Sequence, residues 1–220
     1  MNIVFIFVLL CAFADWFAVA RQNKTLEYIF KPATMLALIA ATLLLMQTPH
    51  DAWQAQWFLI GFVFSLLGDV FLMLPNSRWF IFGLGAFFLA HVCYIVGLNP
   101  TLPPTQAFLL LIPCALIVGF VTRRVIASLR ASDHTSLIAP VIGYGIVMTL
   151  MVFSAWATLF RPEWNDTRRV FVIVGATLFL ISDGMLAWNR FVQPFGAAKL
   201  AIIITYHLGQ IALALSISEG

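Results

Sequence analysis

Long apolar runs alternate with short polar breaks along the whole chain. A helix needs roughly 20 residues to cross the hydrocarbon core of a membrane, which is about 30 Å thick. Apolar runs of this kind cover residues 2–20, 27–47, 53–74, 79–98, 105–122, 136–160, 169–188 and 197–217. The pattern therefore predicts an all-α fold, a polytopic membrane bundle of about eight transmembrane helices.

The breaks between these runs have the composition of turns. Thr48-Pro49-His50-Asp51 and Pro75-Asn76-Ser77 combine proline with small polar residues, and a proline-rich segment, Asn99–Pro104, lies near the middle of the chain. No break is long enough to separate independent domains. We therefore expect residues 1–220 to form a single integral membrane domain.

The composition excludes an ordinary soluble domain. Hydrophobic residues make up 62% of the chain and charged residues only 10%, whereas soluble domains contain about 25% charged residues. The net charge of +3 gives no indication of nucleic-acid binding. The three cysteines, Cys11, Cys93 and Cys114, each lie inside an apolar run without disulfide or zinc spacing, so we expect reduced packing residues. The first run lacks a basic segment before it and is interpreted as a retained span.

Basic residues are distributed unevenly between the connections. Those in or beside the odd-numbered connections are Arg21, Lys24, Lys31, Arg78, Arg123, Arg124, Arg130, Arg190 and Lys199. The even-numbered connections contain only Arg161, Arg168 and Arg169. Because cytoplasmic loops are enriched in lysine and arginine, the odd-numbered connections are predicted to be cytoplasmic. Both termini then face the other side, which we expect to be the periplasmic side of a bacterial inner membrane.

A few ionisable residues lie within the predicted spans. Asp15, Asp69 and Asp183 lie near the C-terminal ends of odd-numbered helices, and Lys31 opens the second helix on the same face. Burying such groups in a membrane is costly, so each one is a candidate for function. The structural alternatives are an interfacial carboxylate at Asp15, a topology anchor at Lys31, and interhelical hydrogen bonds at the other two aspartates.

A weak internal repeat relates spans 3 and 4 to spans 7 and 8. Gly68-Asp69-Val70-Phe71-Leu72-Met73 resembles Ser182-Asp183-Gly184-Met185-Leu186-Ala187. In each copy an arginine follows (Arg78, Arg190), and then a histidine midway through the next helix (His91, His207). Two similar four-helix halves could bring these half-sites face to face.

The depth of these residues follows from the helical rise. The aspartates lie about five residues from their helix ends, roughly 7 Å deep, and the histidines about ten to twelve residues in, roughly 15 to 18 Å deep. Aspartates and histidines are thus expected in different layers, which disfavours a shared metal site. Tyr94 and Gln210, one turn after the histidines, could instead satisfy the imidazoles.

These residues carry a resemblance to a known family. Lys31-Pro32-x-x-Met35, Gly68-Asp69-x-x-Leu72, His91-x-x-Tyr94 and Ser182-Asp183-x-x-Leu186-Ala187 resemble the YhhN family, the bacterial and animal lysoplasmalogenases. The resemblance extends over nearly the whole chain. It implies a hydrolase that cleaves the vinyl ether bond of lysoplasmalogens, yielding a fatty aldehyde and a glycerophospho-alcohol.

Vinyl ether cleavage requires a carboxylic acid that protonates carbon and a second carboxylate that stabilises the resulting cation or activates water. We expect Asp69 and Asp183 to divide these roles, in an order that the sequence leaves open. Groups expected to bind the phosphate or support the site are Lys31, Arg78, Arg190, His91, His207, Asp15 and Tyr94, whereas Tyr144 and Tyr206 are interpreted as packing residues. The expected partners are a lysophospholipid substrate and membrane lipid, and no cofactor or metal is required.

Two other functions remain compatible with the sequence. His91, His207 and the aspartates could hold a divalent ion in a metal-dependent lipid hydrolase. Alternatively, the repeated carboxylates could relay protons in a proton-coupled carrier. A purely structural membrane protein is the weakest alternative, since it gives the repeat no purpose.

Overall fold

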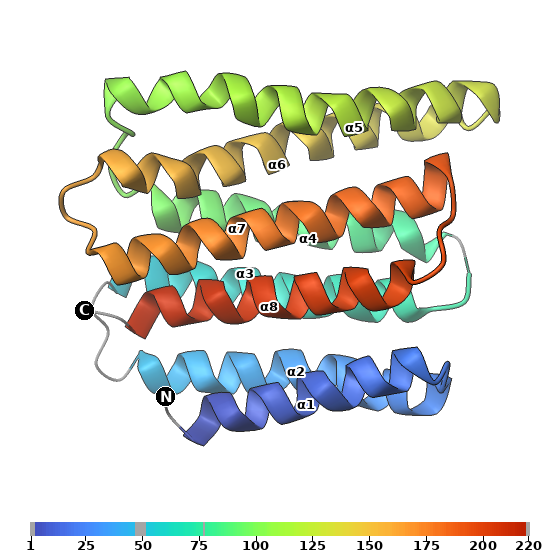
Figure 1. The fold of residues 1–220 in the computed structure, drawn as a ribbon, viewed down its shortest axis with the longest axis horizontal. Coiled ribbons are helices and arrows are strands. Elements are labelled where there is room, and N and C mark those ends of the chain that lie inside the picture. The colour runs from blue at the N-terminus through green and yellow to red at the C-terminus, as the bar shows by residue number, and fades with distance from the viewer. Residues whose placement is uncertain (1–2, 47–51, 77, 219–220) are drawn as a thin grey trace.

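The computed structural model describes residues 3–46, 52–76 and 78–218, and every regular element in these ranges is a helix (Figure 1). The α-helices are α1 (Ile3–Ala20), α2 (Lys24–Leu45), α3 (Ala52–Met73), α4 (Trp79–Leu98), α5 (Leu111–Ala131), α6 (Ile138–Ala157), α7 (Asp166–Ala187) and α8 (Ala198–Ser218). Short helices adjoin them at η1 (Thr105–Leu110), η2 (Thr135–Leu137), η3 (Thr158–Phe160) and η4 (Trp188–Val192).

The prediction of a multi-pass membrane protein is confirmed. Within the described ranges, seven helical stretches are long and apolar enough to cross a membrane, and the shorter apolar helix Val4–Ala20 completes the set of about eight. Large apolar side chains cover the outer faces, for example Phe7 and Phe13 on α1 and Leu116 and Phe120 on α5. These faces are suited to contact lipid, because a bilayer imposes no cost on exposed apolar surface.

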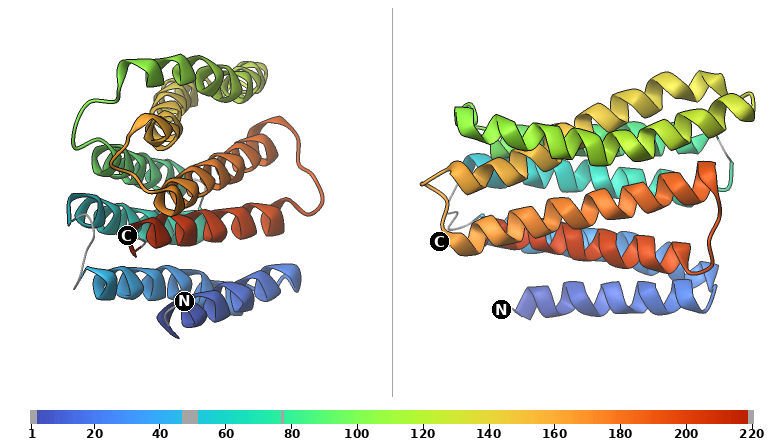
Figure 2. Two further views of the ribbon diagram at one scale, coloured as in Figure 1. Left: turned by 60° about the vertical axis from the view of Figure 1, so that its left-hand side comes forward. Right: turned by 45° about the horizontal axis from the view of Figure 1, so that its top comes forward.

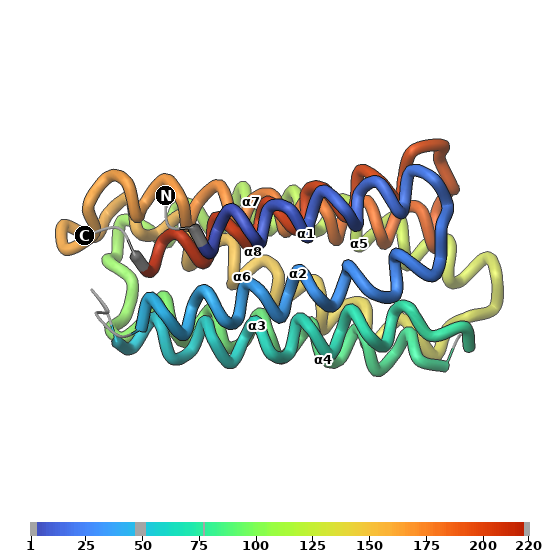
Figure 3. The backbone as a smooth tube through the Cα atoms, turned by 90° about the horizontal axis from the view of Figure 1, so that it is seen from below, coloured from blue at the N-terminus to red at the C-terminus, as the bar shows by residue number. Residues whose placement is uncertain are grey.

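The helices form three groups across the bundle. The hairpins α3–α4 and α7–α8 pack together at the centre, α1–α2 packs against α8 and α3, and α5–α6 packs against α4 and α7. Figures 1 and 2 show this order from α1 and α2 on one side to α5 and α6 on the other. Figure 3 shows that the helices run nearly parallel to one long axis. The proposed repeat units, α3–α4 and α7–α8, are thus neighbours.

The two ends of the bundle differ in charge. The connections α1–α2, α3–α4, α5–α6 and α7–α8 lie at one end, at the right of Figure 1. We call it the basic end, since Arg21, Arg78, Arg130 and Lys199 lie in or beside these connections. The opposite end, with the connections α4–α5 and α6–α7, is called the far end. Asp69, Asp183 and Lys31 all lie in the half of the bundle nearer the basic end.

Glycines allow α7 and α8 to approach closely. A Cβ atom on Gly175 would lie 2.9 Å from the carbonyl oxygen of Gly209, and one on Gly209 would lie 3.0 Å from that of Gly175. Such small residues let transmembrane backbones come together. Farther along the same contact, Ser182 Oγ donates a hydrogen bond to the carbonyl oxygen of Ile202 at 3.0 Å. This packing fixes the helix turn that carries Asp183.

Two helices extend furthest beyond the predicted spans. The fifth span was predicted to end at residue 122, but α5 continues to Ala131 and includes Arg123 and Arg124. The seventh was predicted to cover residues 169–188, but it begins at Asp166 and continues through the π-helical turn η4 to Val192. The apolar run marks only the part of a helix that matches hydrocarbon, so a helix that continues into the polar interface is underestimated. The three cysteines are buried and free, as predicted.

Candidate active site

Asp69 is buried on α3 and has two partners from other helices. Its side chain is only 2% exposed. Lys31 Nζ on α2 lies 3.3 Å from Oδ1, and the hydroxyl of Tyr206 on α8 donates to Oδ2 at 2.7 Å. The preceding Gly68 allows this packing, because a Cβ there would lie 2.6 Å from the ring of Phe87. Three helices thus meet at one carboxylate.

Lys31 lies about two turns from the start of α2, next to a proline. Asn23 caps this helix by accepting a hydrogen bond from the Leu26 backbone amide at 3.2 Å. Pro32 inside the helix has no amide hydrogen to donate, which locally weakens the helical hydrogen bonding. The hydroxyl of Tyr28 donates to the carbonyl oxygen of Met73 at 2.9 Å and fixes α2 against the end of α3. The Lys31 ammonium is thereby held close to Asp69.

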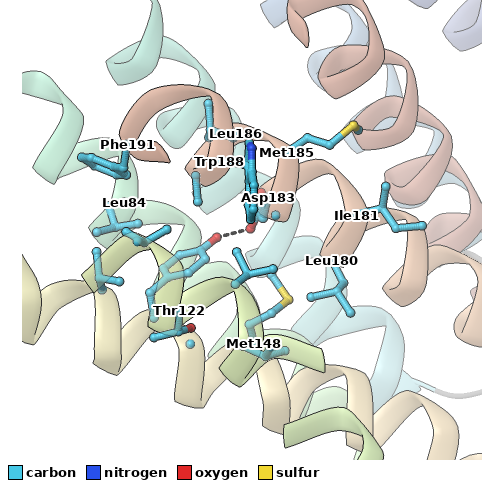
Figure 4. Close-up of a pocket in the computed structure, with 18 of the residues that line it drawn as sticks. Leu84, Thr122, Met148, Leu180, Ile181, Asp183, Met185, Leu186, Trp188 and Phe191 are labelled. Atoms are coloured by element: carbon cyan, nitrogen blue, oxygen red, sulfur yellow. Dashed lines mark hydrogen bonds between the residues drawn. The ribbon is translucent and has the colours of Figure 1, made fainter. Parts of the chain in front are cut away.

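Asp183 on α7 is surrounded by a different set of partners. The hydroxyl of Tyr144 on α6 donates a hydrogen bond to its Oδ2 (Figure 4). His91 Nε2 on α4 lies 3.3 Å from the same oxygen and 3.0 Å from the Tyr144 hydroxyl. The ring of Phe179 packs against the imidazole, with ring centroids 4.6 Å apart. His91 is fully buried, whereas the Asp183 side chain is 13% exposed.

Asp183 lies where two cavities meet. An apolar cavity of about 710 Å³ extends between α4, α5, α6, α7 and η4. A polar cavity of about 340 Å³ at the basic end is lined by charged groups. Figure 4 shows Asp183 within the apolar cavity, among Leu84, Met148, Leu180 and Phe191. Both aspartates line the polar cavity, and Asp183 also lines the apolar one.

The basic groups at the polar cavity include one of the two predicted arginines. Lys24, Lys31, Arg190 and Lys199 all line it. The Arg190 guanidinium lies over the ring of Phe80, with its carbon 3.8 Å from the centroid, an arrangement that stabilises a cation beside an aromatic face. Arg78 lines neither cavity and instead lies against Trp79. The prediction that Arg78 binds phosphate is therefore not supported by its position.

Three predicted supporting residues are buried outside both cavities. Tyr94 bonds to Ser65 at 3.1 Å and to Gln210 at 2.9 Å. His207 Nδ1 accepts a hydrogen bond from Trp16 Nε1 at 3.1 Å. Asp15 is fully buried, and neither of its carboxylate oxygens has a hydrogen-bond partner within the described part of the chain. None of these three residues lines either cavity.

The expectation that aspartates and histidines occupy different layers is wrong for Asp183 and His91, which are in contact. The reason is the continuation of α7 through η4. Asp183 lies about nine residues from Val192, roughly 13 Å from the end of the helical stretch by the rise per residue. That depth approaches the one estimated for His91. Even so, no group of three His, Cys, Asp or Glu side chains that could hold a metal ion occurs among the residues described.

Sequence reasoning missed the two tyrosines that bind the aspartates. Tyr144 and Tyr206 were interpreted as packing residues, yet Tyr144 donates a hydrogen bond to Asp183 and Tyr206 donates one to Asp69. The composition of the chain contained a sign that these tyrosines have a polar role. The chain contains 21 phenylalanines but only 4 tyrosines, so a tyrosine midway through a span stands where phenylalanine would serve for packing alone.

The sequence matches one protein family and several known proteins. The YhhN family matches residues 26–217. The chain is 30% identical over 220 residues to the membrane protein YhhN of Escherichia coli O6:H1, covering 97% of both chains. It is 28% identical over 212 residues to the mouse lysoplasmalogenase TMEM86B, covering 96% of this chain and 84% of the mouse protein.

The human lysoplasmalogenase TMEM86B is 31% identical over 156 residues, which is 70% of this chain. The match spans 60% of the human protein, so part of that protein has no counterpart in the alignment. No solved structure matches the chain.

Proposed function

Because the chain belongs to the YhhN family, we propose that it is a membrane hydrolase that cleaves the vinyl ether bond of lysoplasmalogens. The products are a fatty aldehyde and a glycerophospho-alcohol. Relatives at 28–31% identity are named lysoplasmalogenase, which supports this activity. The substrate would be a lysophospholipid drawn from the surrounding bilayer.

One observation carries the proposal: Asp183 lies at the junction of an apolar cavity and a charged cavity. A lysoplasmalogen is divided in the same way, with an alkenyl chain on one side of the vinyl ether and a glycerophosphate group on the other. The apolar cavity of about 710 Å³ is suited to the chain. Lys31, Arg190 and Lys199 in the polar cavity are suited to the phosphate, since charge-assisted hydrogen bonds favour that group.

The different partners of the two aspartates support different roles. Asp69 lies beside the Lys31 ammonium, which balances the charge of its carboxylate, and it lines only the polar cavity, where water can enter. Asp183 also lines the apolar cavity, where the alkenyl chain would lie, so it is the aspartate placed to reach the vinyl carbon. We therefore assign Asp183 as the general acid and Asp69 as the carboxylate that accepts a proton from water.

The reaction then proceeds in three balanced steps. Asp183 gives its proton to the vinyl carbon farther from the ether oxygen, which leaves an oxocarbenium cation at the other carbon. Water attacks that carbon while Asp69 accepts the water proton, giving a hemiacetal. The hemiacetal collapses as the bond to the glycerol oxygen breaks, that oxygen takes the proton held by Asp69, and the aldehyde forms. The hemiacetal hydroxyl proton returns to Asp183, so that the proton balance is restored.

The test is incubation of the purified protein with a panel of lysolipids that differ only in the sn-1 linkage: vinyl ether, alkyl ether and ester. Aldehyde should be released from the vinyl ether alone, with products identified by mass. In ¹⁸O-labelled water the glycerophospho-alcohol should remain unlabelled, because water attacks the vinyl carbon and not the glycerol carbon.

Other outcomes would replace the proposal. Hydrolysis of the ester alone would make the protein an acyl hydrolase, and a metal requirement for that activity would favour the metal-dependent alternative. Movement of intact lysolipid or solute across sealed vesicles, without any product, would favour the proton-coupled carrier.

The orientation of the protein is a further part of this proposal. We propose that the basic end faces the cytoplasm and that both termini face the opposite side. A reporter enzyme active only outside the cytoplasm, fused after Gly220, should then be active, and an inactive fusion would reverse the orientation.

A further inference from the structure

The apolar cavity approaches the outer surface of the bundle on one side. Among the residues that line it, Ile117 on α5 is 57% exposed and Ile181 on α7 (Figure 4) is 44% exposed. The other exposed lining residues are Phe120 on α5 and residues 193–195, which follow η4. The lining residues from α3, α4 and α6 are all buried or half-buried. The side of the cavity that lipid can reach is therefore the one between α5 and α7.

Two contacts join α5 to η4 on this side of the cavity. The ring of Phe120 stacks on that of Trp188, with centroids 6.5 Å apart and planes inclined by 19°. Two turns farther along α5, the hydroxyl of Ser128 donates a hydrogen bond to the carbonyl oxygen of Phe191. We call the line of cavity residues along this contact the α5 seam, which consists of Ile117, Phe120, Ile181 and Trp188.

The seam lies at the depth where a lipid chain begins. Arg124, one turn after Phe120, is exposed, and its guanidinium carbon lies 5.4 Å from the Phe120 ring centroid. Exposed arginines near the ends of spans reach the membrane interface. Ile117 precedes Arg124 by seven residues, which places it about 10 Å deeper by the helical rise. A lipid whose head group is level with Arg124 thus has the first part of its chain beside the seam.

The helix α5 is suited to move away from η4. It lies at the outer side of the bundle (Figure 1), and among the seven long spans described, the one that contains α5 is the least buried. The stacked aromatic pair and the single hydrogen bond are each modest interactions. The other side of the seam continues into η4, a π-helical turn, and such turns are frequent at functional sites. Separation of α5 from η4 would lengthen the opening along the seam.

We infer that the α5 seam is a lateral portal through which a single-chain lipid passes from the bilayer into the apolar cavity, and that Phe120 and Trp188 close this portal. The inference rests on the proposed function and adds the route of its substrate. The chain remains among apolar side chains during the passage, so its transfer does not expose it to water. Asp183 lines the same cavity, so the portal leads to the proposed general acid.

The experiment tethers the two sides of the seam. In the double variant Phe120→Cys/Trp188→Cys, a short bis-thiosulfonate cross-linker joins the new thiols, and dithiothreitol removes it. The probe is a radiolabelled alkyl ether lysolipid, which the proposed reaction does not cleave. Protein tethered before the lipid is added should take up at least about tenfold less lipid than the reduced protein in the same time. Protein loaded first and then tethered should retain the lipid through washing and release it on reduction.

Two controls isolate the effect of the tether. The same double variant, treated with a monofunctional methyl thiosulfonate, has both thiols modified without a link and should exchange lipid freely. The protein without substitutions is treated with the cross-linker and should not respond, because Cys11, Cys93 and Cys114 are buried. Equal uptake and retention in both orders of addition would overturn the portal. Absence of lipid binding by the reduced double variant would overturn it as well.

Activity gives a separate reading. If the tether traps the lipid but the reduced protein cleaves no vinyl ether lysolipid, the proposed function fails and the portal stands. If a vinyl ether lysolipid is cleaved equally fast with and without the tether, the proposed function stands and the portal fails.

A second variant keeps the test available if the double variant does not fold. Ile117→Trp should narrow the seam and slow both uptake and release of the alkyl ether lysolipid about fivefold, with Kd changed less than about twofold, since a route affects both rates alike. Leu116→Trp adds the same side chain at an exposed neighbour that does not line the cavity, and should change neither rate. A change in Kd alone, or an equal effect of both variants, would show that the lipid enters elsewhere.

Discussion

Both ends of the bundle bury charged side chains, but they bury them differently. At the far end, Arg168 is 3% exposed and donates to Gln54 Oε1 at 2.7 Å and to the carbonyl oxygen of Ser216 at 3.2 Å. Its guanidinium also lies over the ring of Trp164, 4.6 Å from the centroid. Toward the basic end, Asp69 and Lys31 line a cavity. Arg168 lines neither cavity.

A second buried arginine at the far end, Arg161, is likewise bound by protein groups. Arg161 is 2% exposed and donates from its Nη atoms to Asn99 Oδ1 at 3.1 Å and to the side-chain and carbonyl oxygens of Thr101 at 2.9 and 2.8 Å. These contacts join the α4–α5 connection to the α6–α7 connection. Burial of a charge in a membrane bundle therefore does not by itself identify an active site. The buried charges that line the polar cavity differ from Arg168 because a substrate could enter that cavity.

The largest expected effect is on turnover at the basic end. Asp183→Asn and Asp69→Asn should each reduce aldehyde release by about 10³-fold, in the range expected when an acid or base is removed. Both variants should still insert and purify, because asparagine retains hydrogen-bonding capacity at similar volume. The control is Asp166→Asn, a change of the same type at an exposed far-end residue. Wild-type turnover in either variant would remove that aspartate from the mechanism.

The next effect is on stability at the far end. Arg168→Met should lower the free energy of unfolding by about 3 kcal/mol, because hydrogen bonds from a charged donor are lost and polar partners stay buried. The measurement is the thermal melting temperature in detergent, compared with Arg130→Met at the exposed end of α5. Turnover by the folded protein should change less than twofold. A variant that is stable but inactive would contradict the assignment of Arg168 to stability and not to catalysis.

A smaller effect is expected at Tyr144. Tyr144→Phe removes the donor to Asp183 and should lower kcat about tenfold, corresponding to the loss of one hydrogen bond. Tyr94→Phe is a comparison within the same core, since Tyr94 bonds to Ser65 and Gln210 and to neither aspartate. It should lose less activity. An equal loss in both would indicate that general packing, and not the contact with Asp183, supports turnover.

The smallest effect concerns chain length. Val121 lines the apolar cavity, so Val121→Trp should fill part of it and raise KM about fivefold for long alkenyl chains, with little change for short ones. Leu116→Trp places the same side chain on the outer face of α5, where Leu116 is 69% exposed, and should not alter the chain-length profile. Chain-length profiles that coincide for both variants would mean that the alkenyl chain binds elsewhere.

Much of the fold follows directly from the apolar runs, because hydrocarbon thickness dictates their length. The candidate aspartates could also be predicted, since an intramembrane carboxylate is rare and costly. The side-chain partners of these aspartates could not be predicted from the sequence. Whether a tyrosine meets an aspartate depends on helix rotation and packing, which a run of apolar residues does not specify. The depth of Asp183 was underestimated because η4 continues the helix past Ala187 with polar residues, Asn189 and Arg190.

The charge distribution shows a similar limit. Arg161 and Arg168 were counted as loop charges, although both are buried and engaged with the protein. Removing them from that count leaves Arg169 as the even-numbered contribution among the described residues and enlarges the asymmetry behind the orientation proposal. The number of basic residues could be read from the sequence, but their availability to the membrane surface required the structure.

The position of Asp183 between two cavities has a consequence for product departure. Bond cleavage at this residue would leave an oily fragment on one side and a water-soluble one on the other. In the proposed reaction the aldehyde would be left in the apolar cavity and would partition into the bilayer, while the glycerophospho-alcohol would diffuse into the aqueous phase. Neither product then blocks the release of the other. Because the two products enter different phases, they seldom meet again, and the reverse reaction is disfavoured.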